Sequence, residues 1–174
     1  MNTTQTVLGL HPTVAGMGWV LATSPLSLVD WGIVYPGSNK NAKALRRAEY
    51  LIKTFSPSVI VMRHAAGTSR KRVKRIQSLM NSVKHLAKRN GIEFKVYSAG
   101  DVKGRFERFG VATRHEIAAF LAANIPELAS RLPPKRKPWL PEDTRLGLFD
   151  AMAIVIAFFI ERDLLDNPFP PKSK

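Results

Sequence analysis

The chain has 174 residues, with 27 Lys or Arg against 13 Asp or Glu, and a formal net charge of +14. Because it has no cysteine, disulfides and thiolate metal sites are excluded. The longest apolar run, residues 151–160, is too short to span a bilayer.

These features, with a first segment that lacks the basic region of a signal peptide, predict a cytoplasmic protein without a membrane partner. An excess of positive charge attracts polyanions, so nucleic acid is the leading class of partner. A basic but inert surface and a ribosome- or membrane-associated protein are the alternatives, because charge alone does not separate them.

The first third of the chain predicts three strands, over residues 7–10, 18–23 and 28–34, where β-branched and aromatic residues cluster between turn residues. The short connections favour antiparallel neighbours. A helix is predicted over 40–54, followed by a strand at 58–62 whose continuous apolar run is typical of a parallel strand buried on both faces.

The clearest helix covers residues 69–90, where apolar residues recur at helical spacing, and a further strand follows at 92–97. Thr113 and Glu116 form a capping box that opens the next helix. The proline-rich segment 132–141 is predicted to be an extended loop, because proline fixes φ and removes a donor.

A final helix is predicted from about residue 144 to 163. We expect a single domain over residues 1–166, and a disordered basic tail over 167–174, which is rich in Pro and Lys.

Five short motifs, in this order and spacing, resemble those of RuvC-type Holliday junction resolvases in the RNase H-like superfamily. They are Gly9-Leu10-His11-Pro12 with Gly18-Trp19, Val59-Ile60-Val61-Met62-Arg63, Tyr97-Ser98 to Val102-Lys103, Arg114-His115-Glu116-Ile117-Ala118 and Phe149-Asp150-Ala151-Met152-Ala153. The resemblance runs from Val7 to about Glu161. It implies an α/β RNase H-like fold: a mixed five-stranded sheet, with three antiparallel strands and then parallel strands, and helices on both faces.

Resolvases of this family hold two divalent ions with carboxylates at the ends of the first and fourth strands and on the last helix. The corresponding residues here are His11, Arg63, Gly147 and Asp150. Only Asp150 is a carboxylate, and a guanidinium has no acceptor and stays protonated. The resemblance therefore makes Asp150 and His11 the residues at catalytic positions, and Arg63 and Gly147 the marks of a degenerate site that holds no metal.

Asp150 lies within the apolar stripe of the last predicted helix, so a partner is needed for its buried charge. Our hypothesis is that Arg63, with His11, takes the volume of the lost metals and forms an ion pair with Asp150. The alternative is that Asp150 reaches solvent at the edge of the sheet.

Glu142 and Asp143 are candidates for a displaced metal site with Asp150. Two helical turns separate Asp143 from Asp150 by about 10.5 Å, which is long for one ion. Asp143 is alternatively a helix cap, and His115 and Glu116 are interpreted as capping residues. His11 alone is more typical of a hydrogen-bonded structural residue than of a zinc ligand.

Two basic segments are candidates for nucleic-acid binding. The first is Arg70, Lys71, Arg72, Lys74 and Arg75, and the second is Lys135, Arg136, Lys137 and Trp139. Clustered cations without interleaved carboxylates favour contact with a polyanion over a merely solvated face. Trp139 either stacks on an unpaired base or packs back onto the domain as a loop anchor.

The sequence thus predicts a RuvC-like protein that binds branched or structured DNA through a basic surface and is catalytically inactive, with no cofactor. The alternative is a divergent structure-specific endonuclease that uses Mg or Mn, with Asp150 and either His11 or Glu142 and Asp143. A third possibility is a protein whose basic surface meets an acidic partner. The resemblance also implies a homodimer.

Overall fold

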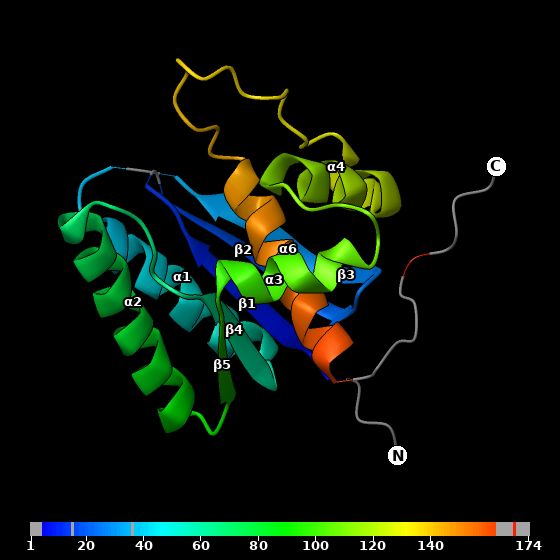
Figure 1. Cartoon of the computed structure of the whole chain (residues 1–174). Helices are drawn as coiled ribbons and strands as arrows, with labels where there is room; N and C mark the ends of the chain where they lie inside the picture. The colour runs from blue at the N-terminus through cyan, green and yellow to red at the C-terminus, as the bar shows by residue number, and fades with distance from the viewer. Residues whose placement is uncertain (1–4, 15, 36, 163–168, 170–174) are drawn as a thin grey trace.

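A mixed five-stranded sheet forms the centre of the molecule in the computed structural model, which describes residues 5–14, 16–35, 37–162 and 169 (Figure 1). Its strands are β1 (Val7–Pro12), β2 (Met17–Ser24), β3 (Ser27–Val34), β4 (Val59–Arg63) and β5 (Glu93–Tyr97). They lie in the order β3-β2-β1-β4-β5. The first three strands pair antiparallel, whereas β4 is parallel to both β1 and β5.

Helices cover both faces of this sheet. They are α1 (Lys40–Phe55), α2 (Arg70–Arg89), α3 (Ala99–Glu107), α4 (Arg114–Asn124), α5 (Pro126–Ala129) and α6 (Leu146–Glu161). In Figure 1, α1 and α2 lie on one face, and α6 crosses the other face with α3 and α4 outside it. The predicted RNase H-like arrangement of strands and helices is confirmed.

Alternation along the strands explains the two cores. Leu8 and Leu10 of β1 pack toward α1 and α2, while Val7 belongs to the core around α6. In β4, likewise, Ile60 and Met62 lie in the first core and Val59 and Val61 in the second. The helix α6 is buried on every side from residue 146 to residue 159, which explains why it is apolar all round.

Several details differ from the sequence prediction. The last helix begins at Leu146, because residues 144–145 form a turn. The nine-residue α3 was not predicted as a separate helix, although Ser98 and Asp101 form its capping box. Segment 132–141 is non-helical, as predicted.

The expected disordered tail lies outside the described residues except for Phe169, which is buried and packs edge-on against Phe109 and Phe120. Within the described part of the chain, every helix is too short or too polar to serve as a membrane span.

Glycines let α6 lie very close to the sheet. A Cβ added at Gly18 of β2 would stand 2.0 Å from the carbonyl oxygen of Gly147, and one at Gly9 of β1 would stand 2.7 Å from that of Ala151. Both obstacles are backbone atoms, which do not move without displacing the helix. The backbone of α6 therefore rests directly on β1 and β2.

We expect Gly18→Ala to lower the free energy of unfolding by roughly 3 kcal/mol, because the helix must move away from the sheet. Chemical denaturation measures this loss. Gly104→Ala, within α3, is the matched control: its Cβ meets nothing within 4 Å, and alanine favours a helix by about 1 kcal/mol. Equal stability of the two variants would contradict the close packing.

Candidate functional site

The carboxyl ends of β1 and β4 carry two of the predicted residues onto the face that α6 covers. Leu10 of β1 lies beside Met62 of β4, so the next positions in this parallel register are His11 and Arg63. Alternation turns both away from α1 and α2. Asp150 meets them from the second turn of α6.

The three side chains converge as the sequence hypothesis required. Nε2 of His11 lies 3.3 Å from Oδ2 of Asp150, and Nη1 of Arg63 lies 3.6 Å from its Oδ1. Asp150 is only 7% exposed. The alternative in which it reaches solvent at the sheet edge is therefore wrong.

The main partner of Asp150 is Arg114, a residue for which no role was predicted. Arg114, the first residue of α4, donates from Nε to both carboxylate oxygens, at 3.1 and 2.9 Å, and from Nη2 to Oδ2. The same guanidinium holds Glu142, with 2.9 Å between Nη1 and Oε2 and between Nη2 and Oε1. One arginine thus bridges two carboxylates.

Local sequence explains how Arg114 is positioned. Thr113 and Glu116 form the predicted capping box, so α4 begins at the position that brings Arg114 over Asp150. Glu116 is confirmed as a capping residue, whereas His115 takes no part in the box. The signal in the sequence was the need for a cation beside a buried carboxylate, which does not identify the cation.

The charges of the cluster follow from burial and from Arg114. Burial raises the pKa of Asp150, and a charged His11 and the hydrogen-bonded guanidinium of Arg114 lower it. The net direction is downward. Since His11 is neutral at pH 7, Arg114 and, with a smaller effect, Arg63 are the cations that keep Asp150 ionised. Burial likewise opposes ionisation of Glu142, and its hydrogen bonds from Arg114 outweigh this and lower its pKa.

His11 is the titratable base of the cluster. Burial lowers its pKa to about 4, despite the opposing attraction of Asp150. Its contact with Asp150 is therefore that of a neutral imidazole at pH 7. The buried Nδ1 of its ring has no hydrogen-bond partner among the described residues.

The residues present do not fit the divalent ions that the resemblance implies. Hydrogen bonds from Arg114 occupy both oxygens of Asp150, and Arg63 and Arg114 place fixed positive charge where ions would lie. Within the described residues, no group of three or more His, Asp or Glu side chains could hold a metal ion.

The other positions considered for a metal serve different purposes. Asp143 binds the backbone N–H of Arg145 at 2.9 Å and its guanidinium at 2.7 Å, so it caps the turn before α6. At Gly147 a Cβ would stand 2.7 Å from Cγ2 of the buried Thr13. This position has no room for a carboxylate side chain without a local shift.

The first basic segment divides into two kinds of residue. Arg70, Lys71 and Lys74 are exposed on α2, whereas Arg72 is half-buried. Arg75 donates to the carbonyl oxygen of Thr13 at 2.7 Å and to Asn41 at 3.1 Å, so it fastens α2 to its neighbours.

The second basic segment lies in the loop before α6. Lys135, Arg136 and Lys137 are exposed, and Trp139 is 75% exposed with the Lys137 ammonium 5.7 Å from its ring centroid. Packing of Trp139 against the domain is therefore wrong. The start of α2 and this loop lie toward the same end of the molecule as the start of α6 (Figure 1).

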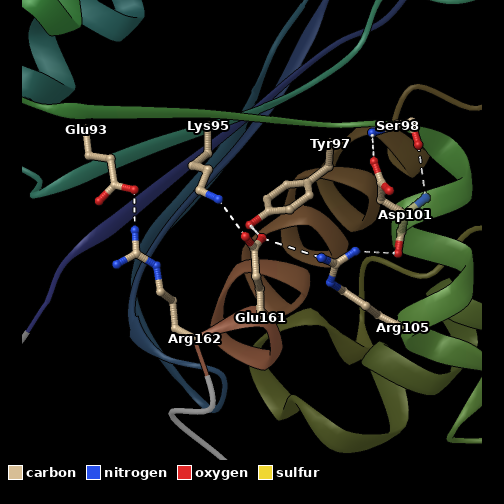
Figure 2. Close-up of polar contacts among 8 residues, drawn as sticks. All are labelled: Glu93, Lys95, Tyr97, Ser98, Asp101, Arg105, Glu161 and Arg162. Carbon is tan, nitrogen blue, oxygen red and sulfur yellow. Dashed lines mark hydrogen bonds and ion pairs between the residues drawn. The ribbon is translucent and has the colours of Figure 1, made fainter.

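A second polar cluster joins the far end of α6 to β5 and α3 (Figure 2). Glu161 accepts from Lys95 at 2.5 Å and from the Tyr97 hydroxyl, and it pairs with Arg105 at 3.5 Å. Burial, together with the bond to Glu161, raises the pKa of Tyr97. The cluster fastens β5, an edge strand of the sheet.

The mixed five-stranded sheet with helices on both faces is an RNase H-like fold. No family model and no curated protein matches the sequence. Solved structures do match. Thermus thermophilus RuvC in complex with a Holliday junction substrate has a TM-score of 0.65 at 16% identity, covering 91% of this chain and 96% of that one.

A second structure of Thermus thermophilus RuvC matches with a TM-score of 0.63 at 18% identity and the same coverage. The yeast mitochondrial Holliday junction resolvase Ydc2 matches at 0.59 and 16% identity, covering 89% of this chain and 79% of that one. At these identities the likeness establishes the fold.

We expect the stability of the protein to fall as the pH drops from 6.5 toward 4. His11 stays neutral in the folded state, while in the unfolded chain its pKa is 6.5, so the unfolded state binds more protons in this window. The loss reaches roughly 3 kcal/mol for this group. Denaturation at several pH values measures it.

A second histidine, His85, provides the control for this slope of stability against pH. His11→Gln should flatten the slope between pH 6.5 and 4, whereas His85→Gln, on an exposed position of α2, should retain it. If both variants keep the slope of the wild type, His11 is not the group responsible.

We expect Arg114→Gln to lower the free energy of unfolding by about 3 kcal/mol, because it leaves the charge of Asp150 buried without its main partner. Denaturation of Arg114→Gln, Asp150→Asn and the double variant forms a double-mutant cycle, in which the double variant should lose less than the sum. Arg145→Gln breaks the half-exposed pair with Asp143 and should cost much less than Arg114→Gln, because solvent screens such a pair. Additive losses would show that Arg114 and Asp150 are not coupled.

Proposed function

We propose that this protein binds branched or structured DNA and does not cleave it. The observation that carries the proposal is the Arg114 guanidinium on Asp150. It saturates the one carboxylate that stands at a family metal position. The fold supports a role in nucleic-acid binding, because a structure that shares it, Thermus thermophilus RuvC, is in complex with a Holliday junction substrate.

Charge supports the same role. The net charge of +14 attracts a polyanion, and the exposed cations Arg70, Lys71 and Lys74 stand together on the first two turns of α2. The exposed Trp139, next to Lys137, offers a ring face on which an unpaired base can stack. A branched substrate supplies such bases and closely spaced phosphates.

The chemistry of the cluster supports the absence of cleavage. Hydrolysis of a phosphodiester by this family depends on ions that activate water and stabilise the leaving oxygen. Arginine offers donors and charge, but it cannot take a proton from water near neutral pH. His11 is a neutral base whose ring faces Asp150, and its lowered pKa makes it a weak acceptor of protons. The dimer implied by the resemblance remains a prediction.

The test uses a labelled four-way junction with Mg²⁺ or Mn²⁺, and the same samples are read by fluorescence anisotropy and on a denaturing gel. We expect tight, salt-dependent binding, weaker binding to a linear duplex of the same length, and no cleavage product. The variant Arg70→Gln, Lys71→Gln, Lys74→Gln should bind at least about tenfold more weakly. Its salt slope should fall by roughly 2–3, since each lost phosphate contact contributes about 0.9.

The matched control removes the same charge from the other end of α2, with Lys84→Gln, Lys88→Gln, Arg89→Gln at exposed positions. It should bind nearly as the wild type does. Binding that does not depend on salt concentration, or equal losses of affinity in both triple variants, would contradict the proposal that this basic surface binds DNA. Cleavage by the wild type that Asp150→Asn abolishes would overturn inactivity and establish the nuclease alternative.

A further inference from the structure

A small pocket of about 120 Å³ lies beside the buried cluster, and its lining includes His11, Arg63, His64, Arg72 and Arg114. It opens where β1 and β4 end and α2 begins. Three arginines line it, and none of its lining residues carries a carboxylate. Such a lining favours an anion.

The three arginines differ in how many of their donors are already used. Arg114 is committed to Asp150 and Glu142. Among the described residues Arg63 pairs only with Asp150, at 3.6 Å, and its side chain is 27% exposed. Arg63 and Arg72 therefore keep guanidinium donors for a ligand in the pocket.

Arg72 provides the stronger evidence for a bound ligand. Its Nε is buried and has no hydrogen-bond partner among the described residues. A buried N–H without an acceptor costs about 1–3 kcal/mol, so native structures rarely keep one unless something else binds there. Arg72 as a whole is only half-buried, and it lines the pocket.

The balance of charge indicates the ligand's charge. Around the pocket and the cluster behind it, the three guanidiniums of Arg63, Arg72 and Arg114 face the two carboxylates of Asp150 and Glu142. Three positive charges against two negative ones leave one positive charge. Arg72 also acts electrostatically on Glu142, so it belongs to this group rather than to the outer face of α2.

We propose that this pocket binds a single phosphate group, held by Arg63 and the buried Nε of Arg72. The guanidinium fork matches phosphate oxygens, and one phosphodiester carries the single negative charge that the site lacks. This inference rests on the proposed binding of nucleic acid and gives it a defined contact. The phosphate comes either from within a strand or from a strand end.

The first experiment follows the arginine side-chain Nε–Hε signals of the ¹⁵N-labelled protein by NMR, with the Arg72 signal assigned by its loss in Arg72→Lys. One arm adds thymidylyl-thymidine, which has only an internal phosphodiester, and the other adds thymidine 5′-monophosphate. We expect the Arg72 signal to shift in a saturable way. A shift in the first arm assigns the pocket to the strand interior, and a shift only in the second assigns it to a strand end.

The second experiment tests whether the junction is bound by this pocket or only by the overall positive charge of the surface. Each variant keeps the positive charge and changes the hydrogen-bond donors. Arg72→Lys removes the planar Nε–H and should weaken binding of the four-way junction about tenfold, whereas Arg89→Lys, at an exposed position in the last turn of α2, should stay within about twofold of the wild type. The melting temperatures of both variants show whether either one has lost its fold.

An Arg72 signal that moves in neither arm overturns the proposed phosphate site, as do equal affinities of Arg72→Lys and Arg89→Lys for the junction. Both results can be obtained while the wild type binds the junction normally, so the proposed function survives them. Loss of junction binding by the wild type itself is the separate result that would overturn the proposed function.

Discussion

The buried charge of Asp150 is the constraint on which the rest of this site depends. A carboxylate that is 7% exposed needs a cation within contact, because an ion without a partner is strongly destabilised away from water. Arg114 supplies it and so fixes the start of α4 against α6. Through Glu142 the same guanidinium holds the segment before α6, and through His11 and Arg63 the carboxylate orders the ends of β1 and β4. One carboxylate thus determines how five segments meet.

Packing and charge determine different features of the position of α6, the helix that carries Asp150. Apolar contact surrounds α6, and glycines at its contact with β1 and β2 set its distance from the sheet. Its polar connections lie near its two ends, with Asp150 bound to α4 and Glu161 bound to β5 and α3 (Figure 2). Hydrophobic burial is not directional, so it does not choose the rotation of a helix that is apolar all round. The two carboxylates supply that direction.

The sequence predicted the parts of this arrangement that depend on local pattern. Alternation and strand order were enough to bring His11 and Arg63 to one edge, and helical periodicity placed Asp150 in a buried stripe. Arg114 escaped prediction because its contact joins residues 36 apart through the packing of α4 on α6, and 27 Lys and Arg residues were available for the role. The position of the Trp139 side chain could not be predicted for a similar reason, because whether a loop side chain packs against the domain depends on the surface beneath it.

An arginine and a divalent ion both attract a phosphate, but they differ in what they can do with it. A divalent ion binds phosphate oxygens and also lowers the pKa of bound water, which provides the nucleophile. A guanidinium keeps the attraction and the geometric match to phosphate but has no open coordination position for water. Arg63 stands at the end of β4, so the same residue that disfavours an ion beside Asp150 lines the neighbouring pocket. The proposed absence of cleavage and the proposed phosphate contact therefore both follow from having an arginine at this position.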